Sequence, residues 1–116
     1  MDAHAHIVAA LAALAQDTRL AIYRLLVAAG PDGLVVGRIG EALDVPATTL
    51  SFHLRTLAQA GLIVARPDGR FIHYAANFDA MRGLIAYLTE NCCDGDPARC
   101  GIAVAAPRAI KRRASR

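Results

Sequence analysis

Two apolar helical segments joined by only three residues constrain the fold of this chain most strongly. The segment 47–60 repeats its large apolar residues at helical spacing, and so does the shorter segment 36–43. The connection between them ends in a proline, which is tolerated in the first turn of a helix. The residues that the spacing places on one face of the second helix are Leu50, Leu54 and Leu57. The pattern predicts two helices joined by a tight turn, the second of which buries its leucine face.

Directly after this pair the periodicity changes from helical to strand-like. Residues 62–66 and 71–75 are short β-type runs, and the sequence Pro-Asp-Gly-Arg at 67–70 joins them. An Asp-Gly step between two such runs is a strong hairpin signal. A tight helix pair followed by a hairpin is the layout of a winged helix-turn-helix, in which the second helix of the pair enters the major groove of DNA.

Three more helices complete the expected fold. Helical spacing predicts them over 6–14, 17–29 and 79–90, and Asp17 or Thr18 is expected to cap the second of them. The fold class is then mainly α with a β-hairpin, in the order α-α-α-α-β-β-α. The composition agrees, because a chain that is 55% hydrophobic and has no Trp favours a helical core. A length of 116 residues corresponds to one domain.

The composition also divides the chain into three parts. Residues 1–91 form the expected DNA-binding and dimerisation domain, residues 92–101 hold every cysteine, and residues 102–116 form a basic tail that is expected to be disordered. No run approaches about 20 clean apolar residues, and the N-terminus lacks the basic start of a secretory signal, so no membrane association is expected. Three cysteines within nine residues argue against a disulfide framework and for reduced thiols in the cytoplasm.

The face of the 47–60 helix opposite its leucines predicts the DNA contacts. Hydroxyl, amide and guanidinium groups there suit base edges and phosphates. Phe52 is unusual on such a face; contact with a thymine methyl is the preferred interpretation, ahead of a protein contact or no role. His53 lies between the two faces, where bracing of the helix is favoured over a base contact. The outward residues are Thr48, Ser51, Phe52, Arg55 and Gln59.

Two arginines flank the hairpin and are further candidates for DNA contact. Arg66 and Arg70 lie where a phosphate or a minor groove would meet a wing, although solvated surface charge is the alternative. The formal net charge is +3, and twelve of the thirteen basic residues are arginine. This balance suits contacts to phosphate and guanine, but a compositional bias of the genome explains it equally well. Double-stranded operator DNA is therefore the expected partner.

Three stretches of the sequence resemble the ArsR family of metalloregulators. Residues 14–26, LAQDTRLAIYRLL, are similar to the family's opening LADPTRLRILRLL. Residues 50–63 are similar to its recognition helix and strand, VSxHLxxLxxAGLV, and residues 69–74 to its GRxxxY wing. The match spans roughly residues 7–90 in the right order and implies a homodimeric repressor, not an enzyme, that leaves DNA when an inducer binds. The family's DNA-reading positions correspond here to Thr48, Thr49, Ser51 and His53.

The resemblance also implies where two subunits meet. The first and last helices keep apolar stripes after the winged-helix core is filled, and in this family these helices form the dimer interface. The residues expected at that interface are Ile7, Leu11, Leu84, Ile85 and Leu88.

Family membership leaves the inducer undetermined, because sensor sites differ between members. The family's Cys-x-Cys site in the helix before the recognition helix is absent, since residues 35–40 contain no cysteine. The zinc-type site on the last helix uses Asp and His, and residues 79–90 contain no histidine. The remaining candidate resembles an arsenic-responsive subgroup with Asn-Cys-Cys after the last helix and one more cysteine nearby. Cys92, Cys93 and Cys100 fit that pattern.

Three thiolates are a soft ligand set, and arsenite and antimonite favour three sulfurs in a trigonal pyramid. Adjacent Cys92 and Cys93 supply two sulfurs, and the turn-forming residues 94–99 allow Cys100 to supply the third within one subunit. The expected inducer is As(III) or Sb(III), with no organic cofactor.

Other roles for the cysteines remain open. A zinc- or cadmium-responsive repressor would need a fourth ligand, which His4 or His6 could supply. A disulfide from Cys100 to Cys92 or Cys93 would make a redox-responsive repressor. A thiol enzyme is disfavoured, because the cysteines follow a helix C-terminus and have acidic neighbours, both of which disfavour a thiolate. No glycine-rich anion-binding loop precedes them.

Overall fold

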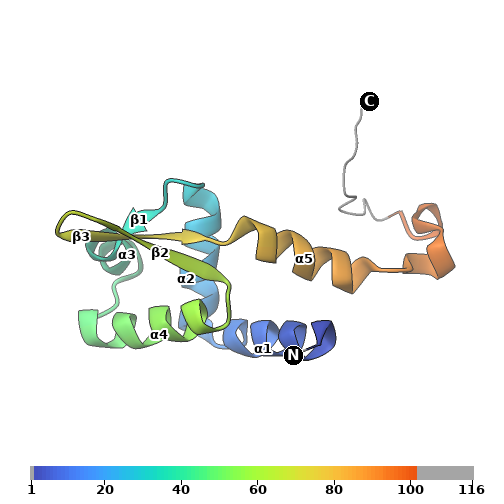
Figure 1. The fold of residues 1–116 in the computed structure, drawn as a ribbon, viewed down its shortest axis with the longest axis horizontal. Helices are drawn as coiled ribbons and strands as arrows, with labels where there is room; N and C mark the ends of the chain where they lie inside the picture. Colours follow the sequence, from blue (N-terminus) through green and yellow to red (C-terminus); the bar gives the residue numbers. More distant parts are fainter. Residues whose placement is uncertain (1, 102–116) are drawn as a thin grey trace. The chain divides into compact units, whose positions relative to one another are not determined.

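The computed structural model describes residues 2–101 of the chain. The described part contains five α-helices, three β-strands and two short 3₁₀ helices (Figure 1). The elements are α1 (Ala3–Leu14), α2 (Asp17–Ala29), β1 (Leu34–Val35), α3 (Val36–Leu43), α4 (Ala47–Gln59), β2 (Ile63–Asp68), β3 (Phe71–Ala76), α5 (Phe78–Thr89), η1 (Cys92–Gly95) and η2 (Pro97–Arg99). Two compact units divide these residues, one ending at Ala80 and one beginning at Met81. The expected tail, 102–116, lies outside the described residues.

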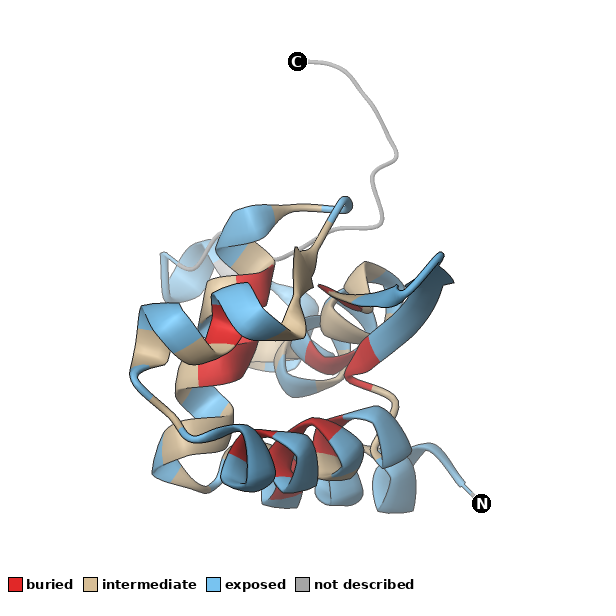
Figure 2. Ribbon diagram, turned by 90° about the vertical axis from the view of Figure 1, so that its left-hand side faces the viewer, coloured by how far each residue is buried: buried red, intermediate tan, exposed pale blue. Residues whose placement is uncertain are grey.

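The core of the first unit forms around the leucine face of α4. The three leucines that helical spacing placed on this face are at most 1% exposed, which confirms that prediction. Figure 2 shows the buried residues in red on short stretches of the helices and at the base of the hairpin, whose outer part is exposed. The largest fully buried side chains are Ile22, Leu26, Ile39, Leu50, Leu54, Leu57 and Leu62. Helices α2, α3 and α4 therefore share one apolar core.

The hairpin belongs to a three-stranded antiparallel sheet in the order β1-β3-β2. Strand β1, which the sequence did not predict, pairs Leu34 with Tyr74 and Val35 with His73. Two residues are too few for alternation to be recognised in a sequence. Strand β2 extends to Asp68, so that Pro67 lies inside the strand rather than in the turn. This position suits proline because β2 is at an edge of the sheet.

The helix ends differ in detail from the expected ones. The N-cap of α2 is Gln16, whose side-chain oxygen accepts a hydrogen bond of 2.8 Å from the backbone N–H of Arg19. Asp17 and Thr18 therefore lie in the first turn, and the expectation that either caps the helix was wrong. Gly61 follows α4 with φ of 79°, as expected of a residue that ends a helix in the left-handed conformation.

No single helix in the described residues is long and apolar enough to span a membrane. Helices α1 and α2 reach that criterion only when they are taken together, and they are bent by 102° at the break between them.

Candidate DNA-binding face and thiol cluster

The outer side of α4 presents a row of exposed side chains. Those predicted to contact DNA lie on the helix whose opposite face fills the core. Phe52 is 57% exposed. Such exposure is unusual for a large aromatic side chain, because it leaves apolar surface in contact with water. The exposed residues of this face are Thr48, Thr49, Ser51, Phe52, Arg55 and Gln59. The structure therefore leaves hydroxyl, guanidinium, amide and aromatic groups accessible on the second helix of the tight pair.

His53 does not belong to this exposed face. Its side chain is 8% exposed, and Nδ1 lies 3.4 Å from a guanidinium nitrogen, Nη1, of Arg19. Burial lowers the pKa of His53, and the positive charge of Arg19 lowers it further. The family-derived expectation that this histidine reads DNA stays a prediction, and the burial of its ring beside Arg19 favours the alternative role, bracing of the helix. Its position is that of a residue that braces the helix.

Arg19 connects this brace to α1. Its Nε donates a hydrogen bond of 2.6 Å to the carbonyl oxygen of Ala13, close to the end of α1, while Nη1 faces His53 of α4. One guanidinium therefore joins three helices. Sequence reasoning missed this role, and the available signal was an arginine in the first turn of α2, three positions before the buried Ile22.

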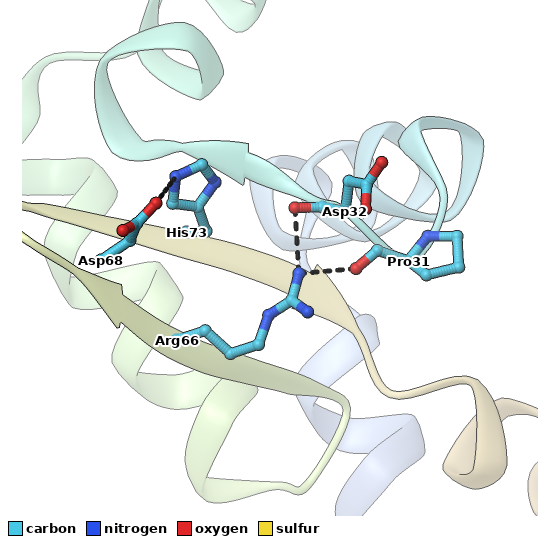
Figure 3. A network of polar contacts seen from close by, with 5 residues as sticks. All are labelled: Pro31, Asp32, Arg66, Asp68 and His73. Atoms are coloured by element: carbon cyan, nitrogen blue, oxygen red, sulfur yellow. Dashed lines mark hydrogen bonds and ion pairs between the residues drawn. The ribbon is translucent and has the colours of Figure 1, made fainter.

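The two wing arginines have different surroundings. Nη2 of Arg66 donates hydrogen bonds to the backbone carbonyl oxygens of Pro31 and Asp32, at 2.6 and 3.0 Å (Figure 3). Arg70 is exposed in the hairpin turn, and no hydrogen bond or ion pair to it is found among residues 2–101. The two arginines are therefore not equivalent candidates for contact with DNA.

The residues expected at a dimer interface are exposed to different extents. Leu88 of α5 is 61% exposed, Leu11 of α1 is 40% exposed and Ile85 is 38% exposed, whereas Ile7 is half-buried. Leu84 is only 8% exposed within the single chain and therefore has little surface left to offer a partner. Helices α1 and α5 thus each present large apolar side chains to their surroundings.

The three cysteines form one cluster after α5. The Sγ atom of Cys92 lies 3.3 Å from that of Cys100 and 3.9 Å from that of Cys93. All three sulfurs lie within 4.8 Å of one another, and none is in a disulfide. The structure therefore brings together, within one chain, the three thiols that the sequence singled out.

The backbone of residues 91–95 produces this cluster through left-handed turns. Asn91, Cys93 and Asp94 have φ of 58°, 53° and 60°. Asn and Asp tolerate this region better than other non-glycine residues. Together with this reversal, the chain returns far enough for Cys100 to approach Cys92. A hydrogen bond of 3.1 Å from the Asp96 N–H to the Cys93 carbonyl closes the turn.

Contacts with the other two thiols disfavour the thiolate form of Cys92. The hydrogen bond with Cys100 is the largest cause that raises the pKa of Cys92 to about 11, followed by partial desolvation and the hydrogen bond with Cys93. The sequence predicted a disfavoured thiolate from acidic neighbours, whereas the structure attributes it to the other thiols. A nucleophilic or highly reactive cysteine has a lowered pKa, so Cys92 is unsuited to such a role.

The donor set fits a three-coordinate soft ion better than zinc. Structural zinc takes four ligands in a tetrahedron. Within the described residues the only group of closely spaced metal-ligating side chains is Cys92, Cys93 and Cys100, and neither His4 nor His6 belongs to it. Three sulfurs and no nitrogen or oxygen match a metalloid that prefers thiolate.

Comparison with known proteins identifies the family. A family model described as a helix-turn-helix domain matches residues 14–66. The uncharacterized HTH-type transcriptional regulator YceK of Bacillus subtilis (strain 168) is 43% identical over 78 residues, which are 67% of this chain and 77% of YceK. The solved structure of an ArsR-like transcriptional regulator from Rhodococcus sp. RHA1 aligns with a TM-score of 0.67 at 25% identity, over 84% of this chain and 88% of that one. The chain belongs to the HTH-type transcriptional regulators.

Two further relatives of this HTH-type regulator extend the comparison. A Halobacterium salinarum (strain ATCC 700922 / JCM 11081 / NRC-1) protein, provisionally named arsenical resistance operon repressor ArsR, is 40% identical over 76 residues, which are 66% of this chain and 56% of that protein. The homodimeric winged helix-turn-helix DNA-binding domain of Mb0332 from Mycobacterium bovis aligns with a TM-score of 0.60 at 29% identity, over 78% of this chain and 84% of that one. The family consists of DNA-binding regulators rather than enzymes.

Proposed function

We propose that this regulator belongs to the ArsR family and is a homodimeric repressor that releases its operator when arsenite or antimonite binds Cys92, Cys93 and Cys100. The observation that carries the proposal is the convergence of three thiols within 4.8 Å on one short segment. Three sulfurs are the donor set that a soft metalloid prefers. The Halobacterium relative, which is named for arsenical resistance, supports the same inducer class.

The binding chemistry is an exchange of hydroxyl for thiol. Each of the three cysteines replaces one hydroxyl group of As(OH)₃, and its S–H proton leaves with that hydroxyl as water. Three As–S bonds form, three As–O bonds break, three waters are released, and no electron is transferred. Reduced thiols are required, so the proposed place of action is the cytoplasm.

DNA recognition is assigned to α4 and the wing. The exposed side chains of α4 would contact base edges and phosphates in the major groove, with Phe52 against a thymine methyl. Arg70, which has no partner among residues 2–101, would meet a phosphate beside the wing. A two-fold dimer would place two such helices about one turn of DNA apart. The assigned contacts are Thr48, Thr49, Ser51, Phe52, Arg55, Gln59 and Arg70.

Dimerisation is assigned to the apolar residues of α1 and α5. Leu11, Ile85 and Leu88 expose much of their surface in the single chain, and burying them against a second copy would remove that surface from water. The homodimeric state of the Mycobacterium bovis domain supports this assignment. Ile7 and Leu84 complete the assigned interface, in which Leu84 has little exposed surface left to bury.

Coupling between the two sites follows from the place of the cysteines in the chain. The cluster begins three residues after the end of α5, a proposed dimer helix. Drawing the three sulfurs onto one ion would change the last turn of that helix and thereby the relative orientation of the two subunits. Couplings of this kind typically amount to about 1–3 kcal/mol, which is enough for a 5- to 150-fold change in affinity for DNA.

A redox-responsive repressor is a second candidate, and the close approach of Cys92 to Cys100 favours it. Peroxide could oxidise the two thiols to a disulfide, with two electrons and two protons passing to the peroxide to give two waters. The raised pKa of Cys92 opposes this role, because the thiolate is the reactive form. Titration with arsenite and with peroxide, described next, therefore tests both candidates.

The test is release of the reduced protein from its own promoter DNA, followed by fluorescence anisotropy during titration with arsenite, antimonite, zinc or peroxide. Arsenite and antimonite should release the wild-type protein at the lowest concentrations. Single Cys→Ser variants should bind DNA like the wild type, because no cysteine lies in the unit that ends at Ala80, and should lose most of the response. Full induction of a Cys92→Ser, Cys93→Ser double variant would refute the proposed sensor.

A further inference from the structure

Arg66 lies on the face of the wing that points away from the core. It shares this face with His73, its partner in the register of β2 and β3, and with Val35, the partner of His73 in β1. Its guanidinium reaches past the central strand to the turn that precedes β1, where Nη2 contacts the carbonyl oxygens of Pro31 and Asp32 (Figure 3). One side chain therefore links the outer strand of the wing to the far side of the sheet.

The turn that receives Arg66 is held firmly against the sheet. Gly33 has φ of 71°, and a Cβ at this position would collide with the carbonyl oxygen of Tyr74 in β3. The Gly33 N–H also donates a hydrogen bond of 3.1 Å to the carbonyl oxygen of Gly30. Because the turn is both closed and packed on β3, it is a fixed point to which β2 can be tied.

The charges around Arg66 disfavour a phosphate. Asp32, Asp68 and His73 line the same open hollow of about 400 Å³ as Arg66. Asp68 in turn lies 3.6 Å from His73, between Oδ2 and Nε2. A phosphate that approached Arg66 here would meet two carboxylates. Arg70 is different, because this hollow does not include it.

We propose that Arg66 is a positioning residue that ties the wing to the 30–33 turn and so holds Arg70 where it can meet the DNA backbone. The inference rests on the proposed DNA-binding function and reassigns one of its predicted contacts. The geometry separates the two wing arginines into one that fixes the wing and one that contacts DNA. The tie acts in the protein before DNA is bound, which makes it testable without DNA.

The first measurement is hydrogen exchange of the β2 and β3 amides in DNA-free protein. Arg66→Met, which keeps the aliphatic stem but removes the donors, should speed exchange of these amides about tenfold while the amides of α4 keep their protection. Arg66→Lys should restore part of the protection, because an ammonium can still donate to one carbonyl. Arg70→Met is the matched control and should leave wing exchange unchanged. Unchanged exchange in Arg66→Met would overturn the tie.

The second measurement is the dependence of operator affinity on salt. Arg66→Met should weaken binding about tenfold with the slope of log affinity against log salt concentration unchanged, whereas Arg70→Met should reduce that slope by about 1. An equal reduction of slope in Arg66→Met would show a direct phosphate contact and overturn the inference. If the wild-type protein bound no operator, the proposed function would fail, and with it the role of Arg66 in DNA binding, while the exchange data would still decide whether the tie exists.

Discussion

The sulfur of Cys92 lies 3.3 Å from the sulfur of Cys100, although the two residues are eight positions apart in the chain. The intervening residues achieve this approach with consecutive left-handed turns at Cys93 and Asp94. Such conformations cost about 1–3 kcal/mol each for non-glycine residues and persist where the surrounding structure requires them. Because the folded segment adopts these unfavourable backbone conformations and thereby holds the three thiols together, it is preorganised for a ligand that all three can bind.

The proton balance separates a metalloid inducer from a divalent cation. Zinc requires thiolates, so each cysteine that binds it must release a proton to solvent, and the raised pKa of Cys92, about 11, makes this costly. Apparent zinc affinity should therefore rise by up to about tenfold per pH unit for each proton released, across the range from about pH 6 to pH 8. Arsenite affinity should stay nearly constant over that range, because the protons leave in water.

Calorimetry in buffers of different ionisation enthalpy measures this difference as the number of protons released per ion bound. The expected value for arsenite is close to zero. Release of two or three protons per arsenite would contradict the exchange of hydroxyl for thiol.

Replacement of Arg55 tests the assignment of α4 as the recognition helix. Arg55 is exposed, so Arg55→Ala should leave the thermal unfolding midpoint unchanged and should weaken operator binding by about 1–3 kcal/mol. Ser51→Ala should add to the loss. Arg24→Ala, which removes an exposed arginine from α2, is the control and should bind nearly as well as the wild type. Wild-type affinity in the combined Arg55 and Ser51 variant at physiological salt would refute the assignment.

The buried position of His53 predicts how stability depends on pH. Its folded-state pKa is lowered, first by burial and then by Arg19, so folding favours the neutral ring. The contribution to the free energy of unfolding is therefore complete above the unfolded pKa of about 6.5 and is lost as the pH falls toward the folded value.

His53→Gln keeps an acceptor for Arg19 but does not titrate, so it should flatten the stability profile below about pH 6.5. Denaturant unfolding at several pH values measures this effect, and His73→Gln on the wing is the control for a more exposed histidine. A pH dependence identical to that of the wild type in His53→Gln would contradict the proposed brace.

The exposed leucine at the end of α5 tests the dimer. Leu88 is 61% exposed, so Leu88→Glu should not unfold the single chain but should place charge in the proposed interface. Sedimentation at micromolar concentration should show a dimer for the wild type and a shift toward monomer for the variant, together with weaker operator binding. Val64→Glu, an exposed site on the wing, is the control for the sedimentation measurement and should remain a dimer. A stable wild-type monomer would remove both the dimer and the proposed coupling.

The sequence predicted the elements that repeat a strong pattern and missed those that depend on a single contact. Helical spacing of Leu50, Leu54 and Leu57 located the core face of α4, because a buried face requires that spacing. The two-residue strand β1 was not predictable, since it exists only through its pairing with β3. The same limit explains Arg66, whose role depends on carbonyls more than thirty positions earlier in the chain.

The cysteine cluster likewise combines a feature that the sequence predicts with features that depend on tertiary contacts. Confinement of all three cysteines to residues 92–100 identified them as one candidate site. The left-handed turns that gather the sulfurs, and the hydrogen bonds between thiols that raise the pKa of Cys92, come from tertiary geometry. The sequence attributed a disfavoured thiolate to the acidic neighbours of the cysteines. These acidic residues lie in the same segment but are not among the causes that raise the pKa of Cys92.

X-ray absorption at the arsenic edge, on reduced protein with one equivalent of arsenite, reports directly whether the cysteines bind the ion. We expect a first shell of three sulfurs and no oxygen, from Cys92, Cys93 and Cys100 of one subunit. A first shell dominated by oxygen would contradict it and would mean that these cysteines are not the sensor.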